Sequence, residues 1–363
     1  MEIGIIGLPR SGKTTIFNAL TKGKAVVSGY SEKPNLGVTK VPDSRLDALA
    51  VMYKPRRVVS AEVTYTDVPP PPEGFGQTKG IGGEYLNTLQ SADALLVVVR
   101  GFEDPSVALF QETVEPLRDA ENMLMEMTFS DLDILDRRLA KIQEGFKGTR
   151  TQERELLGRE QTLLARIKEQ LDNGVALRDQ LLSPDETRLI SGFGFLSMKP
   201  LIVIANIGEP HVGQTEEYER ELADVITGDH VLKVAMCAKL EMELAQMDSE
   251  EEQEFREDLG LVESGLNRMI RLSYEVVEQI SFFTVGEDEV RAWEVHRNTV
   301  AQKAAGKIHS DLERGFIRAE VVSYEDLVHC GGLNEARKRG VLRQEGKDYV
   351  VEDGDIMHVL FNV

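Results

Sequence analysis

The chain has 363 residues, with 42 Lys and Arg against 62 Asp and Glu, and a formal net charge of −20. This charge argues against a protein that coats nucleic acid through its overall field, although a local patch on the surface is still compatible with docking on a ribonucleoprotein. The two cysteines are too few for a disulfide framework. The longest apolar run, residues 94–99, is too short to cross a bilayer, and the N-terminus enters an expected strand at once. We therefore expect a cytoplasmic protein of two or three domains without a membrane segment.

A phosphate-binding loop is predicted near the N-terminus. Residues 7–15 read Gly-Leu-Pro-Arg-Ser-Gly-Lys-Thr-Thr and fit the pattern G-x-x-x-x-G-K-[ST]. An Ile-rich strand is expected over 1–8 and a helix over 15–22, so the helix N-terminus would face a bound anion. Lys13 is the expected catalytic residue and reaches the β and γ oxygens, while the Thr14 hydroxyl is an expected Mg²⁺ ligand. The residues expected to line the nucleotide phosphates are Pro9, Arg10, Ser11, Gly12, Lys13, Thr14 and Thr15. A turn without a ligand is the alternative, and the flanking strand and helix weigh against it.

Asp67 is the second expected Mg²⁺ ligand. A β-rich run over 58–66 precedes it, so Asp67 lies where P-loop NTPases place the carboxylate that holds the metal through water. The alternative is an ordinary aspartate at the end of a strand.

The middle of the chain predicts a helical hairpin inserted into an α/β sheet. A Pro- and Gly-rich loop over 69–83 and a helix over 84–90 lead to a buried strand over 94–100. Leucine and isoleucine then recur at helical spacing over 132–142 and 156–171, on either side of a break at 145–148, which is typical of two antiparallel helices. The segment 136–182 is the least acidic of the chain, so its surface is either a basic contact face or a solvated helical face.

Two further buried strands, 200–205 and 231–236, complete the predicted parallel sheet. The first is followed by Asn206-Ile207-Gly208-Glu209, where GTPases usually carry Asn-Lys-x-Asp. Because Glu replaces Asp and the Lys is absent, the guanine-specific contact is altered, and a penalty against ATP is removed. The residues expected to contact the base are Asn206, Ile207, Glu209, Cys237, Ala238 and Lys239.

The last part of the chain, from about residue 278, predicts a compact β-rich unit. Strands are expected over 290–295 and 316–322, a helix starts at 323, and two short strands are expected within 348–363 around Asp353-Gly354. The unit carries no catalytic constellation, so an interaction module is the default interpretation.

These motifs together resemble the YchF-type Obg-like ATPases, an Obg-family branch of the P-loop NTPases. The resemblance covers nearly the whole chain and rests on the motifs 7–15, 18–21, 41–46, 206–209, 289–293, 304–309, 313–319, 346–349 and 360–363. It implies an α/β fold with a P-loop NTPase G domain on a parallel-rich sheet, an inserted α-helical coiled-coil hairpin and a C-terminal β-grasp (TGS) domain. The implied boundaries are 1–115 and 196–277 for the G domain, 116–195 for the insert and 278–363 for the TGS domain. The resemblance also implies ATP binding with GTP secondary, slow hydrolysis with Mg²⁺, and association with the ribosome, through its large subunit, or with RNA through the TGS domain and the insert.

Two departures from the family pattern concern the switches. The second switch of the family reads Asp-x-Ala-Gly-Leu, whereas this chain has Asp67-Val68-Pro69-Pro70-Pro71-Pro72. Pro70 replaces a glycine whose backbone N–H meets the γ-phosphate, and proline has no N–H to donate. The first switch is about three residues short, and its Mg²⁺-binding threonine has no clear counterpart, with Ser31 and Thr39 as the alternatives.

The sequence therefore predicts a ribosome-associated P-loop NTPase that binds and slowly hydrolyses ATP. The alternative is a nucleotide-binding docking protein that has lost hydrolysis because of the proline-rich second switch.

Overall fold

The computed structural model describes residues 1–23, 34–69, 81, 83–106, 113–146, 151–228, 230–261 and 263–362. The chain forms two compact units. The first, here called the P-loop unit, comprises Met1–Gly37 and Thr64–Leu266, and the second, the C-terminal unit, comprises Val38–Val63 and Asn267–Val363. The expected four-segment domain division stays a prediction. The compact units assign residues 38–63 and 267–277 differently, because both segments fall in the C-terminal unit. None of the described helices is long and apolar enough to span a membrane.

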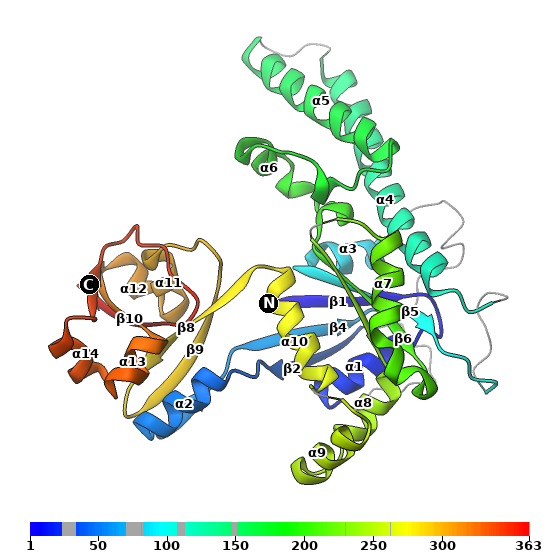
Figure 1. Ribbon diagram of the computed structural model, residues 1–363. Helices are drawn as coiled ribbons and strands as arrows, with labels where there is room; N and C mark the ends of the chain where they lie inside the picture. The colour runs from blue at the N-terminus through cyan, green and yellow to red at the C-terminus, as the bar shows by residue number, and fades with distance from the viewer. Residues whose placement is uncertain are drawn as a thin grey trace. The chain divides into compact units, whose positions relative to one another are not determined.

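The P-loop unit is built on a six-stranded sheet with the order β2-β4-β1-β5-β6-β7 (Figure 1). Its strands are β1 (Glu2–Gly7), β2 (Asn35–Lys40), β4 (Glu62–Asp67), β5 (Ala94–Gly101), β6 (Leu201–Ile207) and β7 (Val231–Met236). β1 pairs in parallel with β4 and β5, and β6 pairs in parallel with β5 and β7. The predicted parallel sheet is confirmed, and the carboxyl ends of β4, β1, β5, β6 and β7 lie at one edge.

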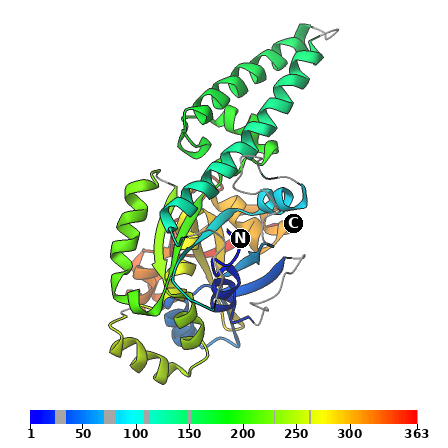
Figure 2. The same ribbon diagram turned by 90° about the vertical axis from the view of Figure 1, so that its right-hand side faces the viewer.

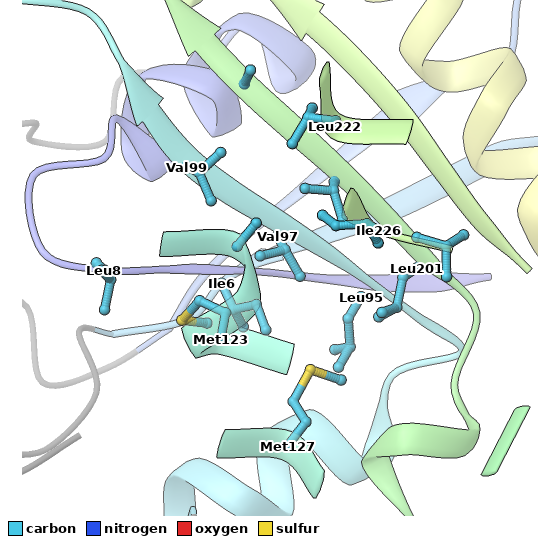
Figure 3. Packing of buried hydrophobic residues seen from close by; sticks show 14 of the residues in the cluster. Ile6, Leu8, Leu95, Val97, Val99, Met123, Met127, Leu201, Leu222 and Ile226 are labelled. Atoms are coloured by element: carbon cyan, nitrogen blue, oxygen red, sulfur yellow. The ribbon is translucent and has the colours of Figure 1, made fainter. Parts of the chain in front are cut away.

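Helices cover both faces of this sheet. Those confined to the P-loop unit are α1 (Lys13–Thr21), α3 (Gly83–Ser91), α4 (Pro116–Gly145), α5 (Thr151–Asp172), α6 (Pro184–Ile190), α7 (Thr215–Val225), α8 (Ala238–Leu244) and α9 (Ser249–Asp258), and α10 (Gly265–Val276) begins at its end. α1 packs against β1 and α8, whereas α4 contacts β5 and α7 contacts β7. Figure 3 shows Met123 and Met127 of α4 in the same buried cluster as Leu95 and Val97 of β5. Burial on both faces explains why β5 is apolar along nearly its whole length.

The predicted helical hairpin is confirmed: α4 and α5 lie side by side as an antiparallel pair (Figure 2). The apolar stripe is the seam of the hairpin, since one buried cluster joins its helices. The members of that cluster on α4 and α5 are Leu135, Ile142, Leu163, Leu164, Ile167 and Leu171. Arg138 and Glu160 clamp the two helices through a bidentate ion pair of 2.6 and 2.7 Å.

Asp131 fastens α4 to the turn that leads into β6. Its carboxylate is fully buried and accepts the backbone N–H groups of Leu196 and Ser197 at 2.8 and 2.7 Å. Burial raises the pKa of Asp131 to about 6, although these hydrogen bonds favour the charged form.

The C-terminal unit has its own six-stranded sheet with the order β11-β10-β12-β8-β9-β3. Its strands are β3 (Arg57–Val59), β8 (Gln279–Val285), β9 (Glu289–His296), β10 (Phe316–Ser323), β11 (Arg343–Glu345) and β12 (Asp355–Phe361). Its helices are α2 (Ser44–Tyr53), α11 (Ala301–Ile308), α12 (Ser310–Arg314), α13 (Tyr324–Cys330) and α14 (Leu333–Arg339). Ala301 and Ala304 of α11 pack in one buried cluster with Phe282 and Val321.

The β-rich run over 58–66 supplies strands to both sheets, because β3 joins the sheet of the C-terminal unit and β4 joins the sheet of the P-loop unit. One sequence expectation for a strand is wrong, since the segment before the Asp353-Gly354 turn is not a strand. Its backbone bonds locally with the start of α11, since Ala301 N–H donates to the Tyr349 carbonyl and Val351 N–H donates to the Thr299 carbonyl. Only β12 follows the turn as expected.

The raised pKa of Asp131 predicts how pH affects stability. The folded chain holds the Asp131 proton more tightly than the unfolded chain does, so the stability that this group contributes is lost as pH rises through about 6. The free energy of unfolding, measured by urea denaturation at about pH 5 and about pH 8, should fall more over this range for the native chain than for Asp131→Asn. The exposed neighbour Asp133 provides the control, since Asp133→Asn should keep the pH dependence of the native chain. Equal slopes for all three proteins would contradict the prediction.

Candidate nucleotide-binding site

The phosphate-binding pattern lies in the loop between β1 and α1. β1 ends at Gly7 and α1 begins at Lys13, with Gly12 as N-cap in the left-handed region at φ 92°. A Cβ on Gly12 would lie 2.1 Å from Asn206 Nδ2, and one on Gly7 would lie 2.3 Å from the Val98 carbonyl oxygen. The two glycines of the motif are therefore required by close packing as well as by backbone conformation.

Lys13 and Thr14 meet the end of β4 at this loop. Lys13 is 7% exposed, and its ammonium donates to the Gly7 carbonyl at 3.2 Å. Burial lowers its pKa to about 8, and the negative charge of Asp67 opposes this shift. The Thr14 hydroxyl donates to Asp67 Oδ2 at 2.9 Å. The structure thus brings together the three residues that the sequence assigned to the γ-phosphate and the metal.

The Asp67 carboxylate fits a divalent cation. It is 5% exposed, and its Oδ2 also accepts the side-chain N–H of Asn35 at 3.2 Å. Its Oδ1 is buried and accepts no hydrogen bond from any described residue, and the same is true of the Ser11 hydroxyl. A buried carboxylate oxygen left open beside a threonine hydroxyl is the oxygen donor set that Mg²⁺ uses with one or two carboxylates and a phosphate.

On the side of the site where the sequence predicts the base, Asn206 joins two loops. It lies at the end of β6 beside Arg100 of β5 and Met236 of β7. Its Nδ2 donates to the Ser11 carbonyl at 3.0 Å, and its Oδ1 accepts the Ala238 backbone N–H at 3.1 Å. Asn206, expected to contact the base, therefore ties the phosphate loop to the loop that starts α8. Because Asn206 is 4% exposed, the link is protected from water.

Glu209 and Lys239 lie at the outer rim of this base side. Lys239 Nζ is 2.8 Å from Glu209 Oε1, with side-chain exposures of 66% and 51%. Since both groups are solvated, the pair contributes little stability but places an ammonium on the carboxylate expected to choose the base.

The other expected residues are distributed as follows. Pro9, Arg10 and Thr15 belong to the phosphate loop and the first turn of α1, and Arg10 is in the left-handed region at φ 66°. Ile207 and Cys237 are buried behind the loops they precede. The proposed switch residues Ser31, Pro70, Pro71 and Pro72 lie outside the described residues. Thr39 lies in β2, within the C-terminal unit.

Sequence reasoning missed two residues of this site. Asn35 contacts the metal-side carboxylate, as described above. Phe102 follows β5 and lies within 4 Å of a Cβ built on Gly12 and of one built on Gly208, so its side chain contacts both the phosphate loop and the loop after β6. Arg100 covers it, with the guanidinium carbon 4.5 Å from the ring centroid. The signal for Phe102 was available, because a residue that follows a parallel strand belongs to the ligand-binding edge of the sheet.

Comparisons with known proteins agree along the whole chain. A family model for the C-terminal region of YchF GTPases, described as a protein of unknown function (DUF933), matches residues 279–362, and one described as 50S ribosome-binding GTPase matches residues 2–133. The ribosome-binding ATPase YchF of Haemophilus influenzae is 38% identical over 365 residues, covering 100% of this chain and 99% of the relative. That of Bacillus subtilis is 35% identical over 368 residues, covering 100% of both. The structure of the Schizosaccharomyces pombe YchF GTPase matches with a TM-score of 0.85 at 30% identity, covering 99% of this chain and 97% of that one.

The packing of Gly12 predicts the effect of a single methyl group. Gly12→Ala places a Cβ on the Asn206 amide in a left-handed conformation, so it should cost roughly 1–2 kcal/mol of stability and break the link between the two loops. Nucleotide binding, measured with a fluorescent ATP analogue, should weaken at least about tenfold because one buried hydrogen bond of the link is lost. Gly158→Ala is the matched control, since nothing lies within 4 Å of its Cβ. Unchanged binding by Gly12→Ala would show that the link is dispensable.

Proposed function

The chain belongs to the YchF family of P-loop NTPases, and we propose that it is a ribosome-associated enzyme that binds ATP, with GTP as the secondary substrate, and hydrolyses it slowly with Mg²⁺. The observation that carries the proposal is the convergence of Lys13, Thr14 and Asp67 at the carboxyl edge of the sheet. Two of these side chains are almost completely buried, and Asp67 keeps one oxygen open. A polyphosphate with its cation supplies the partners that these groups lack.

Each of these residues then has a distinct role in binding the phosphates or the metal. No side chain caps the N-terminus of α1, and its first turn carries no acidic residue to repel an anion, so its backbone N–H groups can bind the phosphates. Lys13 moves from the Gly7 carbonyl to the β and γ oxygens, and the negative phosphates stabilise its charged form against burial. Thr14 and Asp67 hold Mg²⁺, which when bound neutralises charge that develops on the transferring phosphoryl group.

The preference for ATP rests on the base side of the site. Guanine recognition needs a carboxylate that accepts two N–H groups, and Glu209 in this structure accepts the Lys239 ammonium instead. Adenine presents a lone pair at N1 and therefore gains nothing from that carboxylate. The buried link through Asn206 holds the base loop in place for either nucleotide, and Phe102 provides an apolar wall beside it.

Association with the ribosome is proposed from the relatives in Haemophilus influenzae and Bacillus subtilis, which are named ribosome-binding ATPases. We assign the contact to the large subunit or its RNA, through residues 278–363, the expected TGS domain, and through the helical hairpin.

The second candidate is a nucleotide-dependent docking protein without hydrolysis. It is favoured by the run Pro69–Pro72, in which Pro70 has no N–H for the γ-phosphate. Tight nucleotide binding without turnover, even on ribosomes, would select this candidate.

Removing the Lys13 ammonium separates these outcomes. In single-turnover assays of ATP and GTP hydrolysis with Mg²⁺, with and without purified ribosomes, Lys13→Ala should reduce the rate by about 10²-fold or more, because a preorganised donor to the transition state is lost. Lys141→Ala, which changes an exposed lysine of α4, should leave the ribosome-free rate unchanged. A rate that survives Lys13→Ala would refute the assignment of this loop as the catalytic site.

Shortening Glu209 tests its part in base choice. Glu209→Asp should raise the affinity for GTP relative to ATP about tenfold, because the shorter carboxylate withdraws from Lys239 and recovers the guanine geometry, a charged hydrogen bond being worth about 1.5–3 kcal/mol. Glu209→Gln keeps the length but removes the charge, so it should not raise this ratio. The affinities are measured by calorimetry with non-hydrolysable analogues. A ratio that stays the same in Glu209→Asp would assign base choice to the loop 237–239.

A further inference from the structure

Residues 38–63 leave the P-loop unit and become a structural part of the C-terminal unit. β3 adds a parallel edge strand to β9, with Arg57, Val58 and Val59 opposite residues 289–291. The backbone N–H groups of Arg56 and Arg57 donate to the carbonyls of Glu287 and Asp288 at 3.1 Å each. The segment is therefore built into the sheet of the C-terminal unit.

Helix α2 of the same segment is held by one arginine and an apolar face. Leu46 and Leu49 are almost completely buried. The Arg45 guanidinium donates to Asp43 and, through both terminal nitrogens, to Asp353 at 2.9 and 3.2 Å. It also lies 5.3 Å from the ring centroid of Phe283. Asp353 in turn accepts the Ser281 N–H at 2.9 Å, so Arg45 joins α2 to β8 and to the turn before β12.

Residues 38–63 are joined at both ends to strands that carry Asn35 and Asp67, the residues on the expected metal side of the nucleotide site. The chain passes into the C-terminal unit after Gly37, directly beyond Asn35, which contacts Asp67. It returns at Thr64 within β4, the strand that ends at Asp67. Asn35 and the carboxylate expected to hold Mg²⁺ thus lie within a few residues of these two crossings.

The third crossing, after Leu266, is fastened to the base side. Gly265 N–H donates to Glu241 Oε1 at 3.1 Å, and Glu241 lies in α8, the helix that begins at Ala238 of the base loop. Arg256 of α9 binds both Glu241 oxygens at 3.0 and 2.8 Å, and both side chains are buried. Since an unpaired charge would be costly in this place, α8 and the crossing are held as one piece.

We propose that the nucleotide site and the C-terminal unit are coupled through these three crossings, so that binding at one changes affinity at the other. The Arg45–Asp353 contact, here called the clasp, holds residues 38–63 on the C-terminal unit. The inference rests on the proposed function, because the regulated ligand is the nucleotide with its cation. Asp67 accepts Thr14 and Asn35 through one oxygen, and its other oxygen is open. A bound cation would use the open oxygen, and Asp67 and Asn35 would pass the resulting shift to residues 64–67 and 34–37. By linkage, any partner that binds the C-terminal unit and favours one arrangement changes nucleotide affinity by the same factor.

Amide hydrogen exchange on the full chain tests transmission in one direction. Adding Mg²⁺ and a non-hydrolysable ATP analogue should change exchange at the amides of Val41, Arg56 and Arg57, which bond within the C-terminal unit. The emission of Trp293, the single tryptophan, reports on β9 beside β3. Lys13→Ala should abolish both responses at the same nucleotide concentration. Saturated binding with no change at these amides or at Trp293 would overturn the inference while leaving the proposed function intact, whereas no nucleotide binding by the native chain would overturn the proposed function itself.

Variants of the clasp test the other direction. Arg45→Ala should weaken binding of the Mg²⁺–ATP analogue at least about fivefold, the lower range of measured couplings, because the strands that lead to Asn35 and Asp67 lose their anchor. Arg337→Ala is the matched control, since it breaks an Arg337–Glu320 pair of the same unit that does not involve residues 38–63. Asp353→Asn is the milder variant if Arg45→Ala unfolds, because an amide oxygen still accepts the Ser281 N–H while the charge that holds Arg45 is lost. Native affinity in folded Arg45→Ala or in Asp353→Asn would overturn the proposal, as would an equal loss in Arg337→Ala.

Discussion

Parallel pairing of β4, β1, β5, β6 and β7 is the constraint on which the rest of the P-loop unit depends. Because the strands run in the same direction, their carboxyl ends meet at one edge, and residues far apart in the chain become neighbours there. Gly7, Asp67, Phe102 and Asn206 each follow or end one of these strands. Burial on both faces keeps β5 and β6 apolar over most of their length, and their polar residues Arg100 and Asn206 lie near their carboxyl ends.

Buried polar groups at this edge divide into two kinds. Asn206 is satisfied by Ser11 and Ala238, and it makes the phosphate loop and the base loop one rigid element. Asp67 Oδ1 and the Ser11 hydroxyl have no partner among the described residues. Leaving a buried acceptor unpaired costs free energy, which a structural role would not justify and a bound cation or phosphate would recover. The satisfied hydrogen bonds of Asn206 therefore indicate a structural role, whereas the unpaired atoms of Asp67 and Ser11 indicate a place for a ligand.

The helical hairpin and the C-terminal unit show which parts of the fold local sequence patterns can predict. Leucines at helical spacing predicted α4 and α5, because each helix has to bury an apolar stripe and the break near Gly145 leaves the other helix as its partner. For residues 58–66 the β-rich pattern indicated strand but not which sheet the strand would join. β3 and β4 are separated by only two residues and join different sheets, since pairing partners are chosen by long-range contacts that a local pattern does not contain.

The sequence by itself determined the phosphate loop, the carboxylate at the end of β4, the base-side motifs and the family resemblance, because each depends on residue type at fixed local spacing. Only the tertiary structure decided that Asn206 links two loops, that Asn35 and Phe102 belong to the site, and that residues 38–63 complete the C-terminal unit around Arg45 and Asp353. These contacts join residues separated by tens to hundreds of positions. Their geometry is set by how the strands and helices pack, and packing is a property of the folded chain as a whole.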